Sequence, residues 1–131
     1  MQSIKFILNQ HASHLLEWAA SRNAHRPETV EIPENGLVIL NSSSQPICMG
    51  FIRKVEGGYG LIDGYISDPS QSSKDRDQAM SLLTEEIIKL AKELGLSALL
   101  ANTVDDNTFK RSLKHGFSAL PHAIMIKDLR K

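Results

Sequence analysis

The feature that most constrains the fold of this chain is a pair of strand-like runs joined by a tight turn. PICMGFIRKV and YGLIDGYISD are both rich in apolar and β-branched residues, and EGG lies between them. Two glycines in a short connection suit a hairpin between antiparallel strands. In the second run, alternation places Leu61, Asp63 and Tyr65 on one face and Ile62 and Gly64 on the other. The sequence therefore predicts two long strands in direct succession.

One long amphipathic helix follows the hairpin. Its apolar stripe consists of Ala79, Leu83, Ile87, Leu90 or Ala91, and Leu94. Gly95 stands where a glycine commonly ends a helix.

The rest of the chain alternates between strands and helices. We expect a strand over residues 3–8, a helix over 11–22, a loop with two prolines before Gly36, and a strand over 36–40. After the long helix, the apolar run 97–103 predicts a strand buried on both faces. Residues 105–116 predict a short helix, and 117–129 one broken strand or two short ones. These elements predict a single α/β domain over residues 1–131, built on a mixed sheet.

The charge balance and the single cysteine argue against several kinds of protein. Fifteen Lys and Arg equal fifteen Asp and Glu, so no net charge draws the chain to nucleic acid or to an anionic membrane. Cys48 has no disulfide partner, and its apolar neighbours in sequence predict a buried thiol. His11 and His14 lack a third ligand nearby, so no metal site is expected. No apolar run reaches the roughly 20 residues of a membrane span and no leader opens the chain, so we expect a cytoplasmic protein.

Two stretches and the order of the elements resemble the GNAT superfamily of N-acetyltransferases. YISDPS is similar to the end of that family's fourth strand, where an aliphatic residue and a proline precede the cofactor loop. DDNTFKRSLKHGF is similar to its C-terminal stretch, in which an Asn opens a helix that closes with Gly-Phe, here Gly116 and Phe117. The likeness covers nearly the whole chain. It implies a GNAT-like mixed, mostly antiparallel sheet with helices on both faces.

The resemblance also implies a reaction. The protein would transfer an acetyl group from acetyl-coenzyme A (acetyl-CoA) directly to an amine of a small molecule or a protein, without a covalent enzyme intermediate. A base would deprotonate the ammonium group, and an acid would protonate the leaving thiolate. Asp63 on the fourth strand is the first candidate for the base. The family's usual acid, a tyrosine four residues before the glycine, is replaced by Ser112, so Tyr65 or Tyr59 is the remaining candidate.

By the same resemblance, the pantetheine arm of the cofactor would lie between the strands 59–68 and 97–103. It would contact the backbone of Ile66 and Ser67, with Asn107 near its amide. The pyrophosphate would bind at the start of the long helix, against Gln71, Ser72, Ser73, Lys74, Arg76, Gln78 and Ala79.

The cofactor loop departs from the family's glycine pattern. The family has Gln or Arg, two residues, Gly, one residue, and then Gly or Ala, but no glycine occurs here between Gly64 and Gly95. Glycines let the backbone approach a pyrophosphate closely. Asp75 and Gln78 fit a capping box that would occupy the same amides. A second hypothesis therefore stays open, a GNAT-like binding or regulatory module that does not bind CoA.

Other partners are less well supported by the sequence. Nucleic-acid binding would need Arg53, Lys54, Lys110, Arg111 and Lys114 to converge on one face, and their spacing does not require this. We do not expect a nucleic-acid or membrane partner, and a homodimer stays open.

Overall fold

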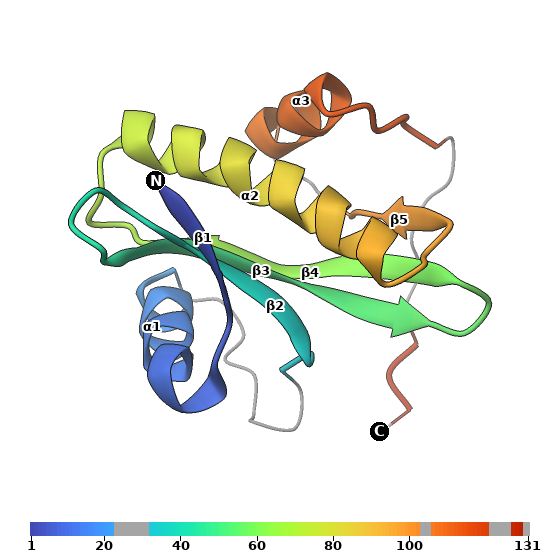
Figure 1. The fold of residues 1–131 in the computed structure, drawn as a ribbon, viewed down its shortest axis with the longest axis horizontal. Coiled ribbons are helices and arrows are strands. Elements are labelled where there is room, and N and C mark those ends of the chain that lie inside the picture. The colour runs from blue at the N-terminus through green and yellow to red at the C-terminus, as the bar shows by residue number, and fades with distance from the viewer. Residues whose placement is uncertain (23–31, 103–105, 121–126, 130–131) are drawn as a thin grey trace.

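The computed structural model describes residues 1–22, 32–102, 106–120 and 127–129. Within these, five strands form one sheet in the order β1-β2-β3-β4-β5 (Figure 1). They are β1 (Gln2–Lys5), β2 (Asn35–Leu40), β3 (Pro46–Val55), β4 (Tyr59–Ser67) and β5 (Ala98–Leu100). The first four strands pair antiparallel, and β4 pairs with β5 in parallel. The prediction of a mixed, mostly antiparallel sheet is confirmed.

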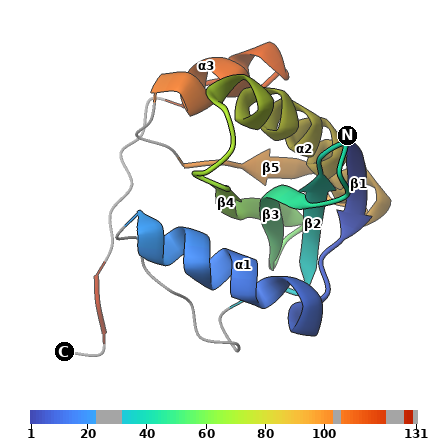
Figure 2. The same ribbon diagram turned by 90° about the vertical axis from the view of Figure 1, so that its left-hand side faces the viewer.

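Helices cover both faces of the sheet, as expected (Figures 1 and 2). Helix α1 (Leu8–Ser21) packs on one face, where Leu15 and Trp18 join a cluster with Val38, Met49 and Phe51. Helix α2 (Ser73–Glu93) lies on the other face, with the shorter helix α3 (Asp106–Lys114) above it. The buried residues of α2 are Ala79, Leu83, Thr84, Ile87 and Ala91, so the predicted stripe is confirmed with Ala91 as its fourth member. Cys48 is fully buried beneath this helix, also as predicted.

Glycine ends both helices on this face, because each helix closes with a residue in the left-handed region. Gly95 has φ of +75°, and the Leu96 N–H donates to the Ala91 carbonyl at 3.0 Å. Gly116 has φ of +88°, and the amide after it makes the same bond across six residues, to Ser112. This bond satisfies carbonyls that a helix otherwise leaves without a partner.

A bulge in β4 overturns the predicted alternation of its side chains. Opposite Gly50, where the register of the pair shifts, β4 carries two residues, Gly64 and Tyr65. Gly64 takes φ of +64°, which a residue with a side chain rarely adopts. Tyr65 thereby turns toward α2, while Asp63 stays opposite Phe51 on the side of α1. The prediction that Asp63 and Tyr65 share a face is wrong, because the extra residue reverses the alternation between them.

The expectation for the fifth strand is also wrong in part. β5 is three residues long rather than seven, and Leu100 is 38% exposed. Among the described residues, β5 pairs only with β4. The apolar run 97–103 therefore does not form the strand buried on both faces that the sequence predicted. The described parts of the predicted C-terminal strands, residues 117–120 and 127–129, contain no strand. Residues 121–126, and most of the predicted loop before Gly36, lie outside the described residues.

The start of α1 is held by a buried histidine. The Ile7 N–H donates to His11 Nδ1 at 2.8 Å, and the His11 ring contacts the Phe6 ring. Burial, and to a lesser extent His14, lowers the pKa of His11, so the folded protein favours the neutral ring that can accept this bond.

We therefore expect the stability of the fold to fall as the pH drops through the ordinary histidine pKa. The unfolded chain takes up the proton at a higher pH than folded His11, so the free energy of unfolding decreases between about pH 7 and pH 5. The variant H11Q should have a flatter dependence over that range in urea denaturation. H115Q is the matched control, because His115 follows α3 and is remote from the start of α1. Equal slopes for H11Q and the wild type would contradict this account.

Candidate active site

A cleft opens where β4 and β5 part. Their parallel pairing covers only three residue pairs and ends at Leu61 and Leu100, whereas β4 continues to Ser67. Beyond Leu61, the edge of β4 that faced β5 has no strand partner among the described residues. A cavity of about 450 Å³ fills this opening. It is lined from β4 (residues 61–65), α2 (Thr84), the chain after β5 (Ala101, Asn102), α3 (Thr108, Arg111, Ser112) and Phe117.

Two buried polar groups in the cleft lack a hydrogen-bond partner. They are the Tyr65 hydroxyl and the Arg111 Nε–H. The neighbouring hydroxyls are already engaged, since Thr84 donates to the Met80 carbonyl and Ser112 to the Thr108 carbonyl, both at 2.9 Å. A buried donor without an acceptor costs free energy, which an oxygen or sulfur of a bound molecule would recover.

Tyr65 is suited to donating a hydrogen bond and poorly suited to releasing its proton. Burial raises the pKa of its hydroxyl well above the ordinary tyrosine value, and the neighbouring Thr84 hydroxyl and, to a lesser extent, the positive charge of Arg111 offset only part of that shift. The neutral phenol therefore persists across the physiological range.

An ion pair joins the two helices above the cleft. Arg111 of α3 donates from Nη2 to Asp77 Oδ1 of α2 at 2.6 Å. The Arg111 side chain is only 13% exposed, whereas Asp77 lies on the surface at 72%. The guanidinium therefore points one nitrogen outward to a carboxylate and keeps Nε inside.

The start of α2 is capped by Ser72. Its Oγ accepts a hydrogen bond from the Asp75 N–H at 3.1 Å, and its carbonyl accepts from Arg76. The prediction that Asp75 is the capping side chain is wrong: the helix begins earlier, so Asp75 supplies the donor at the third helical position. The amides of Ser73 and Lys74 have no acceptor among the described residues. Two N–H groups at the positive end of the helix dipole thus stay available.

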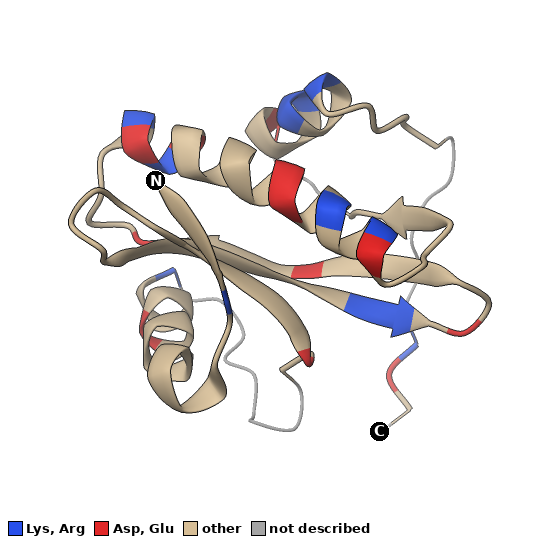
Figure 3. Cartoon of the chain, in the orientation of Figure 1, with Lys and Arg blue, Asp and Glu red and all other residues tan. Residues whose placement is uncertain are grey.

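Two arginines meet beside this helix start. Arg22, at the end of α1, donates to Ser67 Oγ at 3.2 Å, and Arg76 donates to Ser73 Oγ at 3.3 Å. Burial and the nearby Arg76 lower the pKa of Arg22, while Asp68 acts against that shift. The Nε–H of Arg76 is buried without a partner. Figure 3 shows that basic and acidic residues lie together in the first turns of α2. We use the term helix mouth for Ser67, Arg22, Arg76 and the free amides of Ser73 and Lys74.

The predicted base is held in an ion pair. Asp63 Oδ2 accepts from Arg53 Nε at 2.5 Å, and Oδ1 accepts from the Gly64 N–H at 2.8 Å. Asp63 is also one of the residues that line the cleft. Asp63 and Tyr65 thus line one cavity from different faces of β4.

The remaining predicted residues are spread around the helix mouth. Ile66 packs on the α1 side of the sheet, and the Gln71 side chain reaches Asp68 at 3.5 Å. Gln78 and Ala79 lie in the second turn of α2, where backbone N–H groups are engaged within the helix, and Ala79 is fully buried. Asn107 is exposed in the first turn of α3 and does not line the cleft.

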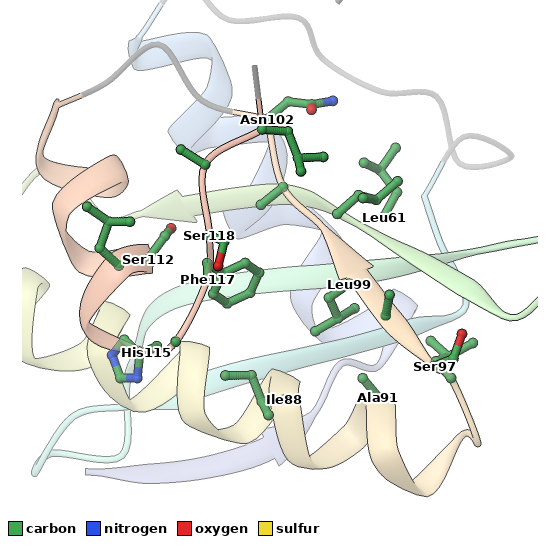
Figure 4. Close-up of a pocket in the computed structure, with 18 of the residues that line it drawn as sticks. Leu61, Ile88, Ala91, Ser97, Leu99, Asn102, Ser112, His115, Phe117 and Ser118 are labelled. Atoms are coloured by element: carbon green, nitrogen blue, oxygen red, sulfur yellow. The ribbon is translucent and has the colours of Figure 1, made fainter. Parts of the chain in front are cut away.

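A second, larger cavity of about 870 Å³ adjoins the first (Figure 4). It lies between β5, the C-terminal half of α2 and the segment after α3, and both cavities share Leu61, Asn102, Ser112 and Phe117. Its walls are largely apolar, with Ile88, Ala91 and Leu99 among them. The two unpartnered donors lie in the smaller cavity, so we assign the chemistry to that one.

Neither a metal centre nor a membrane helix is found in the described part of the chain. No three side chains of His, Cys, Asp or Glu come together there in a way that could hold an ion. None of the helices in those ranges is long and apolar enough to cross a bilayer.

Comparison by sequence gives no match, either to a protein-family model or to a curated protein. Comparison by structure matches solved acetyltransferases over nearly the whole chain. Glucosamine-6-phosphate N-acetyltransferase from Arabidopsis thaliana superposes with a TM-score of 0.72 at 17% identity, covering 98% of this chain and 97% of that one. An acetyltransferase from Trypanosoma brucei gives 0.68 at 15% identity, with 96% and 98% covered. A Mycobacterium tuberculosis protein in complex with CoA gives 0.73 at 12% identity, with 94% and 76% covered.

The chain has the fold of the GNAT acetyltransferases. The element order deduced from the sequence is confirmed from β1 to α3. The sequence resemblance implied that a cofactor arm lies between the fourth and fifth strands. In the structure, β4 and β5 separate after Leu61 and Leu100.

Sequence reasoning missed two residues of this GNAT-like site. Arg22 was assigned only to the end of the first helix, and Arg111 only to a surface charge group. Both lie far in sequence from the residues that they approach, Ser67 and Asp77, so no local pattern could indicate the contacts. A signal did exist for Arg111, because it directly precedes Ser112, where the family's tyrosine is missing.

The cap assignment can be tested on stability. S72A removes the side-chain acceptor of the Asp75 N–H and should lower the free energy of unfolding by about 1 kcal/mol. D75N removes a charge that acts only through the helix dipole, so its effect should fade in high salt while that of S72A persists. Urea denaturation at low and high salt separates the two. A larger loss for D75N than for S72A in high salt would restore Asp75 as the cap.

Proposed function

We propose that this protein is an N-acetyltransferase that moves an acetyl group from acetyl-CoA directly to an amine acceptor. The observation that carries this proposal is the continuity of β4 with the helix mouth. Residues 61–65 of β4 line the cleft, and Ser67, at its end, lies against Arg22. A long ligand with an anionic end and a polar arm fits this course.

The helix mouth supports pyrophosphate binding despite the missing glycines. Two free amides, the dipole of α2 and two arginines all favour a negative charge there. Asp77, one of the two aspartates near the loop, is drawn to Arg111. Asp75 and Asp68, which lies near Arg22, offset the charges of the two arginines, so the free amides and the dipole of α2 supply the remaining attraction for an anion.

The cleft supports the transfer step. The unpaired edge of β4 offers backbone groups to the amides of a pantetheine arm, as an additional strand would. The amine nitrogen attacks the thioester carbonyl carbon, the C–S bond breaks, and the sulfur leaves with the electron pair. Asp63 is the carboxylate at hand to take the proton from the ammonium group, directly or through water.

A second candidate is a module of this fold that does not bind CoA. The loop without glycine and Ser112 in place of the tyrosine favour it. This candidate needs no acceptor, whereas the proposed acetyl transfer takes an amine of a small molecule or of a protein as its acceptor.

Isothermal titration with acetyl-CoA distinguishes these two functions. R22Q and R76Q should each weaken binding about tenfold or more, because a charge-assisted hydrogen bond contributes about 1.5–3 kcal/mol. K89Q is the matched control, since Lys89 lies on the same helix and pairs with Glu86 away from the mouth. No heat and no thermal stabilisation at millimolar acetyl-CoA would leave the second candidate, since binding at a hundredfold excess over Kd stabilises a fold by about 2.7 kcal/mol.

A further inference from the structure

We propose that the Arg111 guanidinium, together with the Tyr65 hydroxyl, forms a site that stabilises the sulfur of CoA as a thiolate. This rests on the proposed acetyl transfer and names the group that takes the place of the missing acid. Arg111 would be a catalytic residue, since it contacts the leaving atom, and Asp77 a positioning residue.

Both donors are built into the cleft and lack partners. The Nε–H of Arg111 and the O–H of Tyr65 are buried, line the same cavity, and come from α3 and β4, the two elements on either side of it. The guanidinium is close enough to Tyr65 to favour the ionised form of its hydroxyl. Two donors and a positive charge in one cavity form a site for an anion or for an atom that becomes one.

The two other groups that could protonate the thiolate, the hydroxyls of Ser112 and Tyr65, are poorly suited to do so. The Ser112 hydroxyl donates to its own helix at the Thr108 carbonyl. Tyr65 keeps its proton because it is buried. A fixed cation needs no proton at all, and arginine stays charged under any physiological condition.

The step balances without a proton donor. The neutral amine nitrogen forms a bond to the acetyl carbon, and the C–S bond breaks with its electron pair moving to sulfur. The proton of the amine goes to the base or to water. The thiolate leaves as an anion paired with Arg111 and is protonated after release, when it reaches solvent.

Asp77 fixes where the charge lies. Its carboxylate takes Nη2 at 2.6 Å and leaves Nε turned inward. The titratable or charged groups that line the cleft are Asp63 and Tyr65 from β4 and Arg111 from α3, while α2 contributes the neutral Thr84. Asp63 is paired with Arg53, and Cys48 of β3, covered by α2, stays a neutral thiol because burial raises its pKa to about 12. Arg111 is thus the one cation among the described residues that line this cavity.

The test measures the ionisation of CoA on the protein. The thiolate absorbs in the ultraviolet, so a pH titration of the bound cofactor gives its thiol pKa directly. We expect a value at least one pKa unit below that of an ordinary thiol, about 8.5, which is a tenfold larger ionisation constant. R111M should return the thiol to its ordinary value, R111K should retain part of the shift, and Y65F should reduce it.

Desulfo-CoA and D77N are the matched controls. R111M should bind desulfo-CoA as the wild type does, because this probe has no sulfur, and that binding also verifies that the variant is folded. D77N removes the carboxylate that positions Arg111 but leaves the guanidinium charge, so it should retain part of the shift, more than R111M does. An ordinary thiol pKa in wild-type protein that binds CoA would overturn this inference alone. Loss of the shift in D77N to the same degree as in R111M would overturn the charge effect in favour of helix placement. Failure of the wild type to bind either probe would instead refute the proposed function.

Discussion

The site depends on the early end of the pairing between β4 and β5. Three residue pairs hold the two strands together, and then β4 runs on through the Gly64 bulge to Ser67 without its neighbour. A buried backbone edge without hydrogen bonds is costly, so an open edge next to a cavity favours a ligand that can complete it. The bulge adds a second consequence, since it turns Tyr65 toward α2 and into the cleft.

Arginines lie at both ends of the cleft, Arg22 and Arg76 at the helix mouth and Arg111 inside. The loop has no glycine to bring the backbone close to a phosphate, and in the proposed function the long side chains of Arg22 and Arg76 would take that role. The ion pair between Arg111 and Asp77 has two effects. It holds the Asp77 carboxylate toward α3, and it fixes the Arg111 guanidinium at the cleft.

Local rules predicted the frame of the fold and failed where residues distant in sequence meet. The helix ends at Gly95 and Gly116 follow from backbone conformation, and the stripe of α2 follows from its period, so both could be inferred from the sequence. The faces of β4 could not, because a single inserted residue reverses the alternation without leaving a pattern. The cap was misassigned by three residues, since Ser72 and Asp75 are both good capping residues and only the start of the helix decides between them.

The contrast between Asp63 and the two arginines, Arg22 and Arg111, explains why site residues are harder to infer than elements. Asp63 stands in a conspicuous place in the sequence, yet its charge is balanced by Arg53, two residues from it across the hairpin. Arg22 and Arg111 stand in ordinary helical positions, yet their charges are only partly balanced where they meet β4 and α2. A side chain is available for chemistry when one of its polar atoms still lacks a hydrogen-bond partner after folding. Whether a polar atom lacks a partner depends on the packed structure. In this cleft, the atoms without one are Arg111 Nε and the Tyr65 hydroxyl, on opposite walls.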